Sequence, residues 1–552
     1  MVQDGSSAGQ TNRPPASGQN PQWWDQAGGG APAPAPAPAP AAGGISGGGG
    51  SGGGDLTEEL LRTGVWSDGM VAAAGIPIVD SQFVTLGGGM GSFVTVDYLR
   101  IAGVGTDRMK VLSDIDHPWQ TYEYLTRVSQ IPRSARIRSD SASRPDNIWG
   151  FPSYALSEAI QTKSLASLKQ VFLEPMWADF YTPRAGMVFT GIEREAKRIS
   201  YFDMLAKGQV RMVRRRSDGG YFTILTPPEA EPAKRVAFRS QFVHLAVGYP
   251  GLKYLPELQN FRTEHQDFYH VVSAYEDHEH VYDRLRAKPG TVFLRGGGIV
   301  SSRALQRLMD DRAKYNLNTQ IVHLFRTYVR SPHGPNAWMR RPGSNGFAYQ
   351  GFNYPKSVWG GQLKAKMRKL EGQDRAKEYD LMGGTNTPWR RSWQAQMNEG
   401  RTQGWYHTLE GTVDQMKVRD DGMVVSLVKT PQGVVEIAAD FVIDCTGLEA
   451  DITEHRVLAD LLEHSGAGRN PKNRLDVERT FELRGTRSGT GVMYASGAAT
   501  LGGYFPGVDT FLGLQIAAQE ITDDLARNGF CPRMGPARST SQWLRWLRNQ
   551  PP

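Results

Sequence analysis

Two short glycine runs, each directly after an apolar segment, constrain the fold of this chain more than any other feature. The first run follows Phe83–Leu86 and the second follows Val292–Arg295, and both have the spacing G-x-G-x-x-S. A strand that enters such a loop and continues as a helix brings backbone N–H groups close to a pyrophosphate, whose charge the helix N-terminus favours. The two runs therefore predict two dinucleotide sites, with Gly87, Gly89 and Ser92 at one and Gly296, Gly298 and Ser301 at the other.

Composition excludes several other classes of protein. The 552 residues, 39% of them hydrophobic, allow two or three globular domains, and no apolar run approaches the roughly 20 residues of a membrane span. The net charge of +7 comes with arginines scattered along the chain, so we expect a small-molecule substrate and no nucleic acid. Cys445 and Cys531 form no C-x-x-C pair. We therefore expect a cytoplasmic protein with no redox dithiol and no metal site.

The first 54 residues have the composition of a disordered segment. A Pro-Ala repeat over residues 31–40 is followed by a Gly-Ser run that ends at Gly54. Such a segment has too little apolar surface to offset the entropy of ordering it. The pair Trp23-Trp24 is either an anchor for a protein partner or an incidental pair on a polar tail.

Strands and helices alternate from about residue 76, which favours parallel sheets built from βαβ units. Each glycine loop is followed by a helix, a second strand and a hairpin with an Asp-Gly turn, and then by another strand. That last strand ends 158 residues after Gly87 in the first half, at Leu245, and 148 residues after Gly296 in the second half, at Asp444. The pattern predicts an internal duplication.

With these segments in order, the sequence resembles the two-dinucleotide-binding-domain flavoproteins, which include the class B flavin monooxygenases and N-hydroxylases. The segments 245–248 and 444–447 stand where that family passes between its FAD and NAD(P)H domains, and residues 493–500 and 505–515 resemble its second FAD motif. The resemblance implies an α/β fold in which an FAD domain is interrupted by an NADPH domain. It also implies that FAD contacts Gly497, Thr500, Asp509 and Thr510.

Three positions bear on how well this chain would hold FAD. Asp114 follows the second predicted strand and is the candidate for the ribose hydroxyls of the cofactor. Ala498 stands where the family has an Asp that holds the flavin side chain, and Ser92 replaces the third glycine of the first loop. Two interpretations stay open: an active oxidoreductase, or a degenerate nucleotide-binding relative that acts as an interaction protein through its tails.

The absence of a cysteine pair leaves hydride transfer from NADPH to flavin, with electrons passing to oxygen or another acceptor. The segment 268–275 resembles the His-Ser segment of N-hydroxylating flavoproteins, and on that resemblance His270 and Ser273 are the catalytic candidates. A structural linker histidine is the alternative for His270. The resemblance therefore implies a monooxygenase-like enzyme or a reductase without a dithiol.

Arginine at the end of a predicted strand indicates which nicotinamide nucleotide the second site binds. The predicted strand 320–326 ends at Arg326, with Arg330 beyond it and no acidic residue at the strand end. Arginine pairs with a 2′-phosphate, whereas an acidic residue would accept the ribose hydroxyl of NADH, so we predict NADPH. Ser302 and Arg303 are further candidate phosphate donors.

Residues 331–400 form an aromatic and basic insertion that either lines a substrate cavity or packs over the sheet. We place the boundaries as follows: a disordered tail and linker over 1–75, an FAD domain over 76–265 and 431–535, an NADPH domain over 266–430, and a C-terminal tail over 536–552.

Overall fold

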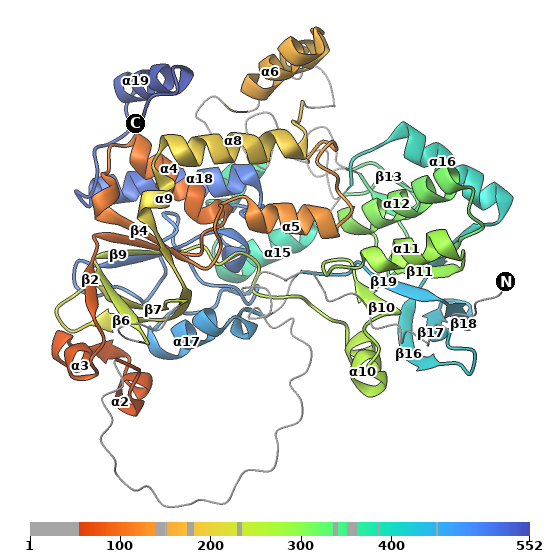
Figure 1. Ribbon diagram of the computed structural model, residues 1–552, viewed down its shortest axis with the longest axis horizontal. Coiled ribbons are helices and arrows are strands. Elements are labelled where there is room, and N and C mark those ends of the chain that lie inside the picture. The colour runs from red at the N-terminus through yellow and green to blue at the C-terminus, as the bar shows by residue number, and fades with distance from the viewer. Residues whose placement is uncertain are drawn as a thin grey trace, which may run out of the picture.

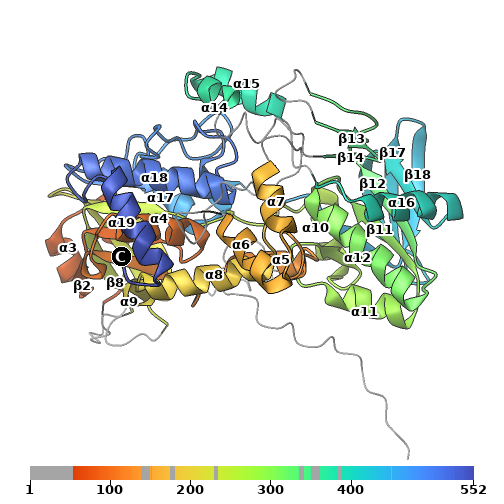
Figure 2. The ribbon, with the colours of Figure 1, turned by 90° about the horizontal axis from the view of Figure 1, so that it is seen from above.

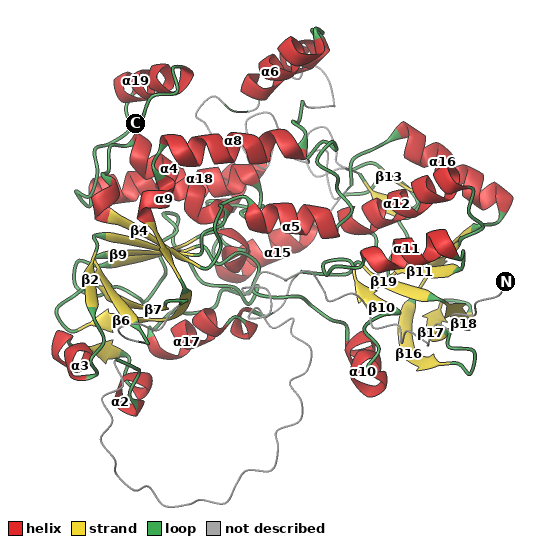
Figure 3. Cartoon of the chain, in the orientation of Figure 1, coloured by secondary structure: helices red, strands yellow, loops and turns green. Residues whose placement is uncertain are grey.

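The structure is a computed structural model in which two α/β domains lie side by side (Figures 1 and 3). It describes residues 54–137, 150, 152–173, 181–228, 234–334, 341–349, 361–382, 387–448 and 451–552. The predicted disordered segment over 1–53, including Trp23-Trp24, lies outside these residues. Of the helices in the described part of the chain, none combines the length and the hydrophobicity needed to cross a membrane.

The first domain is built on a parallel sheet of five strands in the order β20-β9-β3-β4-β5. These strands cover Val492–Ala495, Phe242–Leu245, Phe83–Leu86, Met109–Ser113 and Leu205–Lys207. Strands β20, β9 and β3 are buried along their whole length, as expected of a parallel sheet covered on both faces. Helices α4 (Met90–Ile101), α8 (Ala185–Arg198) and α18 (Phe511–Arg527) pack on one face.

The second domain repeats this design. Its parallel sheet has the order β10-β19-β11-β12-β15. The strands cover Val271–Ser273, Phe441–Asp444, Thr291–Arg295, Gln320–Phe325 and Tyr406–Glu410. Helices α11 (Glu279–Ala287), α12 (Ile299–Tyr315) and α16 (Arg391–Gln403) supply the apolar side chains that cover one face.

A three-stranded antiparallel meander covers the other face of each sheet. In the first domain it consists of β6 (Gln209–Arg216), β7 (Tyr221–Thr226) and β8 (Val236–Ser240), packed together with α17 (Arg456–His464). In the second it consists of β16 (Thr412–Val418), β17 (Val424–Thr430) and β18 (Gly433–Ala439), packed with α10 (Pro256–His265). In both domains the strand after the meander pairs in parallel with the strand before the glycine loop. The predicted α/β fold with its internal duplication is confirmed.

The boundaries in the structure differ from those predicted. Residues 54–75 are not linker: α2 (Glu58–Arg62), β1 (Val65–Trp66) and α3 (Asp68–Ala73) pack on the first meander, and β1 extends it by pairing with β6. The second domain continues past residue 430, because β18 completes its meander and β19 lies inside its sheet. Helix α10 packs in its core, so this domain begins before 266. Turn signals cannot reveal which sheet a strand joins.

Two further segments carry structure that the sequence did not suggest. Residues 536–552 contain helix α19 (Pro536–Leu547) in place of a plain tail. Within the insertion, α14 (Gln362–Met367) and α15 (Gly372–Met382) lie near the first domain, as seen from above in Figure 2. Arg375 donates to the carbonyl of Gly502 at 3.0 Å, and Tyr379 donates to the carbonyl of Phe505 at 3.0 Å. The insertion therefore ties the two domains together.

A buried chain of polar side chains crosses the central strands of the first sheet. The Ser92 hydroxyl lies 2.8 Å from the Thr85 hydroxyl, and that hydroxyl lies 3.0 Å from Nδ1 of His244. Nε2 of the same histidine lies 2.9 Å from the Ser496 hydroxyl. Burial lowers the pKa of His244 to about 3, so the ring is neutral and both of its nitrogens are used.

The buried His244 predicts a measurable loss of stability in acid. Because its folded pKa lies below the unfolded value of about 6.5, unfolding takes up a proton, and its stabilisation is lost as the pH falls from about 6.5 toward 3. His244→Gln should therefore flatten the slope of unfolding free energy against pH by about 1.4 kcal/mol per unit between pH 6 and 5. Urea unfolding at several pH values measures this slope. His407→Gln, at an exposed histidine, is the control, and an unchanged slope in His244→Gln would contradict the prediction.

Candidate functional site

A single large cavity lies at the carboxyl ends of both parallel sheets, where open α/β sheets bind their ligands. Its volume is about 1420 Å³, and both glycine loops line it. That volume exceeds the roughly 300–1,000 Å³ typical of a pocket for one small molecule. The cavity therefore has room for more than one ligand.

In the first glycine loop, Gly87 fixes the backbone conformation and Gly89 faces the open space of the cavity. Gly87 has φ +89°, and a Cβ there would lie 2.6 Å from the carbonyl oxygen of Ala246, so only glycine fits. Gly89 is the N-cap of α4, and a Cβ there would meet nothing within 4 Å. No side chain caps α4. The first N–H groups of this helix therefore lack a side-chain acceptor on the side where Gly89 faces open space.

The second loop repeats this geometry. Gly296 has φ +119°, and a Cβ there would lie 3.0 Å from the carbonyl oxygen of Cys445. Gly298 is the N-cap of α12, and no side chain caps this helix either. Two uncapped helix N-termini thus line one cavity, and each is a favourable position for a phosphate group.

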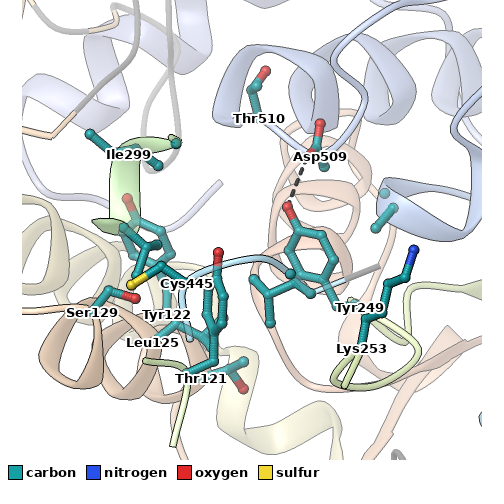
Figure 4. Close-up of a pocket in the computed structure, with 18 of the residues that line it drawn as sticks. Thr121, Tyr122, Leu125, Ser129, Tyr249, Lys253, Ile299, Cys445, Asp509 and Thr510 are labelled. Carbon is teal, nitrogen blue, oxygen red and sulfur yellow. Dashed lines mark hydrogen bonds between the residues drawn. The ribbon is translucent and has the colours of Figure 1, made fainter. Parts of the chain in front are cut away.

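The third element predicted from the sequence begins α18. Thr510 is its N-cap: the hydroxyl accepts from the N–H of Gly513 at 3.1 Å and donates to the carbonyl of Gly507. The Tyr249 hydroxyl donates to Asp509 at 2.8 Å, so the segment after β9 reaches across to the start of α18 (Figure 4). Gly497, Asp509 and Thr510 all line the cavity.

Asp114 directly follows β4 and lines the cavity at the carboxyl end of the first sheet. Burial raises the pKa of its carboxyl group, and the Lys207 ammonium group partly offsets this effect. The ammonium group donates to the backbone carbonyl of Asp114 at 2.5 Å and to Asp116 at 2.8 Å. No hydrogen-bond donor on a side chain reaches the Asp114 carboxylate within the described residues, which leaves it free for a ligand hydroxyl.

Three predicted cofactor residues do not present their side chains to the cavity. Ser92 is buried beneath the first loop in the chain that leads to His244. The Ser301 hydroxyl donates to the carbonyl of Gly298 at 3.0 Å, and the Thr500 hydroxyl donates to that of Gly497 at 2.9 Å. These side chains stabilise the loops from within, a role that motif spacing cannot distinguish from ligand contact.

The two catalytic candidates are not brought to the cavity. His270 precedes β10, at the amino end of the second sheet, and its Nδ1 lies 2.8 Å from Asp267. Ser273 is buried at the other end of β10, and its hydroxyl accepts from the N–H of Tyr275. Neither lines the cavity. Both side chains instead bond within their own segment, to Asp267 and to the N–H of Tyr275.

The two arginines at the end of β12 are in different environments. Arg326 lines the cavity, and the described residues include no ion-pair partner for it. Arg330 instead pairs with Glu410 at 2.9 Å and stacks on Tyr328. Of the aromatic residues in the insertion, Trp393 is buried in the core of the second domain, whereas Trp338, Phe352 and Trp359 lie outside the described residues.

The cavity also contains residues that sequence reasoning missed. Arg295, at the end of β11, pairs with Glu257 of α10, and its strand partner Asp444 has a carboxyl pKa raised by burial. Tyr122 of α5 (Gln120–Val128) and Lys253 line the wall shown in Figure 4. Arg295 lies at the end of a strand and Lys253 lies in the segment after β9, and these positions are the sequence signal that could have indicated them. Tyr122 lies inside a helix, where no such signal exists.

Solved structures with a similar fold come from flavin-dependent enzymes. An ornithine hydroxylase from Pseudomonas aeruginosa superposes with a TM-score of 0.58 at 13% identity, covering 82% of this chain and 100% of that one. An ornithine N-hydroxylase from Kutzneria sp. 744, solved with reduced FAD, NADP+ and L-ornithine, gives 0.60 at 13% identity, with coverage of 82% and 100%. An FAD-bound cadaverine monooxygenase from Erwinia amylovora gives 0.58 at 12% identity, with coverage of 83% and 98%.

No protein-family model and no curated protein sequence matches the chain. Identities this low show a common fold, and the coverage shows that this fold extends over nearly the whole of each solved structure. The order of elements, the paired glycine loops and the superposition all indicate the same fold. The chain has the fold of the two-dinucleotide-binding-domain flavoproteins, as the sequence predicts.

Proposed function

We propose that this protein is an FAD-dependent oxidoreductase that takes hydride from NADPH and acts as a monooxygenase on a small organic substrate. One observation carries the proposal: two uncapped helix N-termini, each preceded by a glycine loop, line the same cavity. That arrangement suits two dinucleotides that meet end to end. The solved structures of similar fold are hydroxylases and monooxygenases by their names, which supports this proposal.

The residues of the first domain fit FAD. Gly89 leaves open space where a pyrophosphate would approach the N-terminus of α4, and Asp114 offers a carboxylate to the ribose hydroxyls. Ala498 supplies no carboxylate for the flavin side chain, but Asp509 also lines the cavity and accepts from Tyr249. The N-terminus of α18, which begins after Thr510, would favour negative charge on the flavin ring.

The residues of the second domain fit NADPH. Gly298 and the N-terminus of α12 would hold its pyrophosphate, and Arg326 would pair with its 2′-phosphate. FAD, when bound, would supply the redox chemistry by accepting hydride and passing electrons to oxygen or another acceptor. The described cysteines, Cys445 and Cys531, are both buried and unpaired, so this chain offers no dithiol to carry electrons.

The alternative of a degenerate interaction protein has less support. The solved structures of similar fold are hydroxylases and monooxygenases by their names. The glycine geometry, the half-buried Asp114 and the uncapped helices are all retained, although Ala498 departs from the motif. Such features favour a working nucleotide site.

The direct test is the absorption spectrum of the purified full-length chain, followed by anaerobic addition of NADPH. We expect flavin bands that bleach as the nucleotide is added. A colourless protein that cannot be reconstituted with FAD would contradict the proposal. Comparing peroxide formed with oxygen consumed, with and without candidate amines, then separates a coupled monooxygenase from an oxidase.

Substitutions at the first loop separate folding from cofactor binding. Gly89→Ala adds a methyl group to the open side of the loop, where φ is −79°, so the melting temperature should stay close to the wild type while FAD affinity falls about tenfold or more. Gly87→Ala should instead destabilise the protein by about 1–3 kcal/mol, because φ is +89° and the Ala246 carbonyl blocks the methyl group. Thermal unfolding and FAD titration measure the two effects, and wild-type FAD affinity in Gly89→Ala would argue against a phosphate at this loop.

The choice of nucleotide should depend on Arg326. Arg326→Ala removes a charge-assisted hydrogen bond to the 2′-phosphate, so the preference for NADPH over NADH in flavin reduction should fall about tenfold. Arg330→Ala is the matched control, because Arg330 is paired with Glu410 and does not line the cavity. An unchanged preference in Arg326→Ala would refute the assignment.

A further inference from the structure

Two arginines meet beside the first turn of α12, on the wall that the second domain contributes to the cavity. Arg303 lies on this helix and lines the cavity. Arg390, the N-cap of α16, reaches the same turn: its Nη2 lies 3.3 Å from the carbonyl oxygen of Ser302 and 3.4 Å from the Ser302 hydroxyl. The two guanidinium groups repel each other, and this repulsion adds to burial in lowering the pKa of Arg390 to about 9.

The described residues leave both guanidinium groups poorly satisfied. Nε of Arg303, and Nε and Nη1 of Arg390, are buried without a hydrogen-bond partner. Arg390 lies 4.5 Å from the ring centre of Trp393, and no carboxylate within the described part of the chain is at ion-pair distance from either arginine. Asp310 acts electrostatically on both arginines, and its carboxylate accepts from Gln306 and Gln396.

Four acidic residues of the insertion are paired with other cations. Residues 327–370 contain eight Lys or Arg and no Asp or Glu, and residues 383–398 contain no Asp or Glu either. Between these two segments lie Glu371, Asp374, Glu378 and Asp380, whose carboxylates pair with Arg375, Lys377, Lys366 and Lys472. A buried cation without a counter-charge is unfavourable by several kcal/mol. Buried charges in proteins are usually paired with an opposite charge. Here an anion would reach the two arginines through the cavity.

We propose that Arg303 and Arg390 form a binding site for an oxyanion, either a phosphate or a carboxylate group, on the second domain's wall of the cavity. Arg303 contacts the ligand, and Arg390 strengthens the positive potential from behind. The inference deepens the proposed function and rests on it for the source of the anion. That source is a phosphate of the nicotinamide nucleotide or a carboxylate of the organic substrate, and both share this chemistry.

Arg303 is placed for direct contact because it shares a helix face with Ile299 and Val300, which also line the cavity. Its neighbour Ser302 is already used, since the Ser302 hydroxyl lies 2.7 Å from the hydroxyl of Thr387. Arg326 lines the cavity from the end of the adjacent strand β12. The proposed site is therefore separate in sequence and in structural element from Arg326.

Calorimetric titration tests the proposal on the full chain saturated with FAD. Wild type, Arg303→Gln, Arg303→Lys and the control Arg391→Gln, at an exposed arginine of the same insertion, are titrated with NADP+, NAD+ and succinate. We expect Arg303→Gln to lose about tenfold or more in affinity for at least one probe, Arg303→Lys to recover part of it, and Arg391→Gln to match the wild type. Arg390→Gln should show a smaller loss for the same probe.

The probes for which affinity is lost identify which anionic group binds at Arg303. A loss for NADP+ alone indicates the 2′-phosphate, an equal loss for both nucleotides indicates the pyrophosphate, and a loss for succinate alone indicates a substrate carboxylate. Wild-type affinity of Arg303→Gln for all three probes, or no binding of any probe by the wild type, would overturn the proposal. These titrations detect heat and need no electron transfer, so a protein that NADPH does not reduce refutes the proposed function without deciding this inference.

Thermal unfolding gives an independent readout that needs no ligand. Because an uncompensated buried charge destabilises the folded chain, Arg390→Gln should raise the melting temperature by about 2 °C or more without nucleotide, while Arg391→Gln should leave it unchanged. The same Arg390→Gln variant should gain less stability than the wild type when the identified probe is added. A lower melting temperature in Arg390→Gln would show that Arg390 has a purely structural role.

Discussion

The contact between the first glycine of each loop and the carbonyl group beyond the neighbouring strand governs the rest of this structure. Gly87 lies against the Ala246 carbonyl and Gly296 against that of Cys445, both with positive φ. A side chain at either position would push the loop away from the sheet and shift the helix that follows. Because these contacts hold, both helix N-termini face one cavity, and every proposal about function depends on that arrangement.

The cavity wall carries charged groups from both domains. The first domain contributes Asp114 and Asp509, together with Arg136, Arg211 and Arg456. The second contributes Arg295, which is compensated by Glu257, together with Arg303 and Arg326, which have no carboxylate partner within the described residues. A partly buried arginine without a counter-charge, such as Arg303, is unfavourable in the empty protein and favourable once an anion is present. The stability of the chain and its ligand binding are thus expected to be coupled.

The predictions that held are those that depend on local backbone chemistry. The two glycine loops, the helices they begin and the hairpins with Asp-Gly turns are present, because each needs only a few neighbouring residues. The direction in which each polar side chain points depends on packing. Ser92, Ser301 and His270 are polar residues in the right motifs, but they bond to their own loops or to Asp267 and do not reach the cavity.

The sequence alone indicates two similar α/β units, each with a glycine loop, in a fixed order, since periodicity and turn chemistry are local properties. The tertiary structure decided which sheet each strand joins, and so it moved the domain boundaries and placed 54–75 within the first domain. It also decided which charged side chains converge. Arg303 and Arg390 are 87 residues apart in sequence and meet at one helical turn, because the insertion between them folds back on α12. No pattern along the chain carries that information, since it arises only from packing.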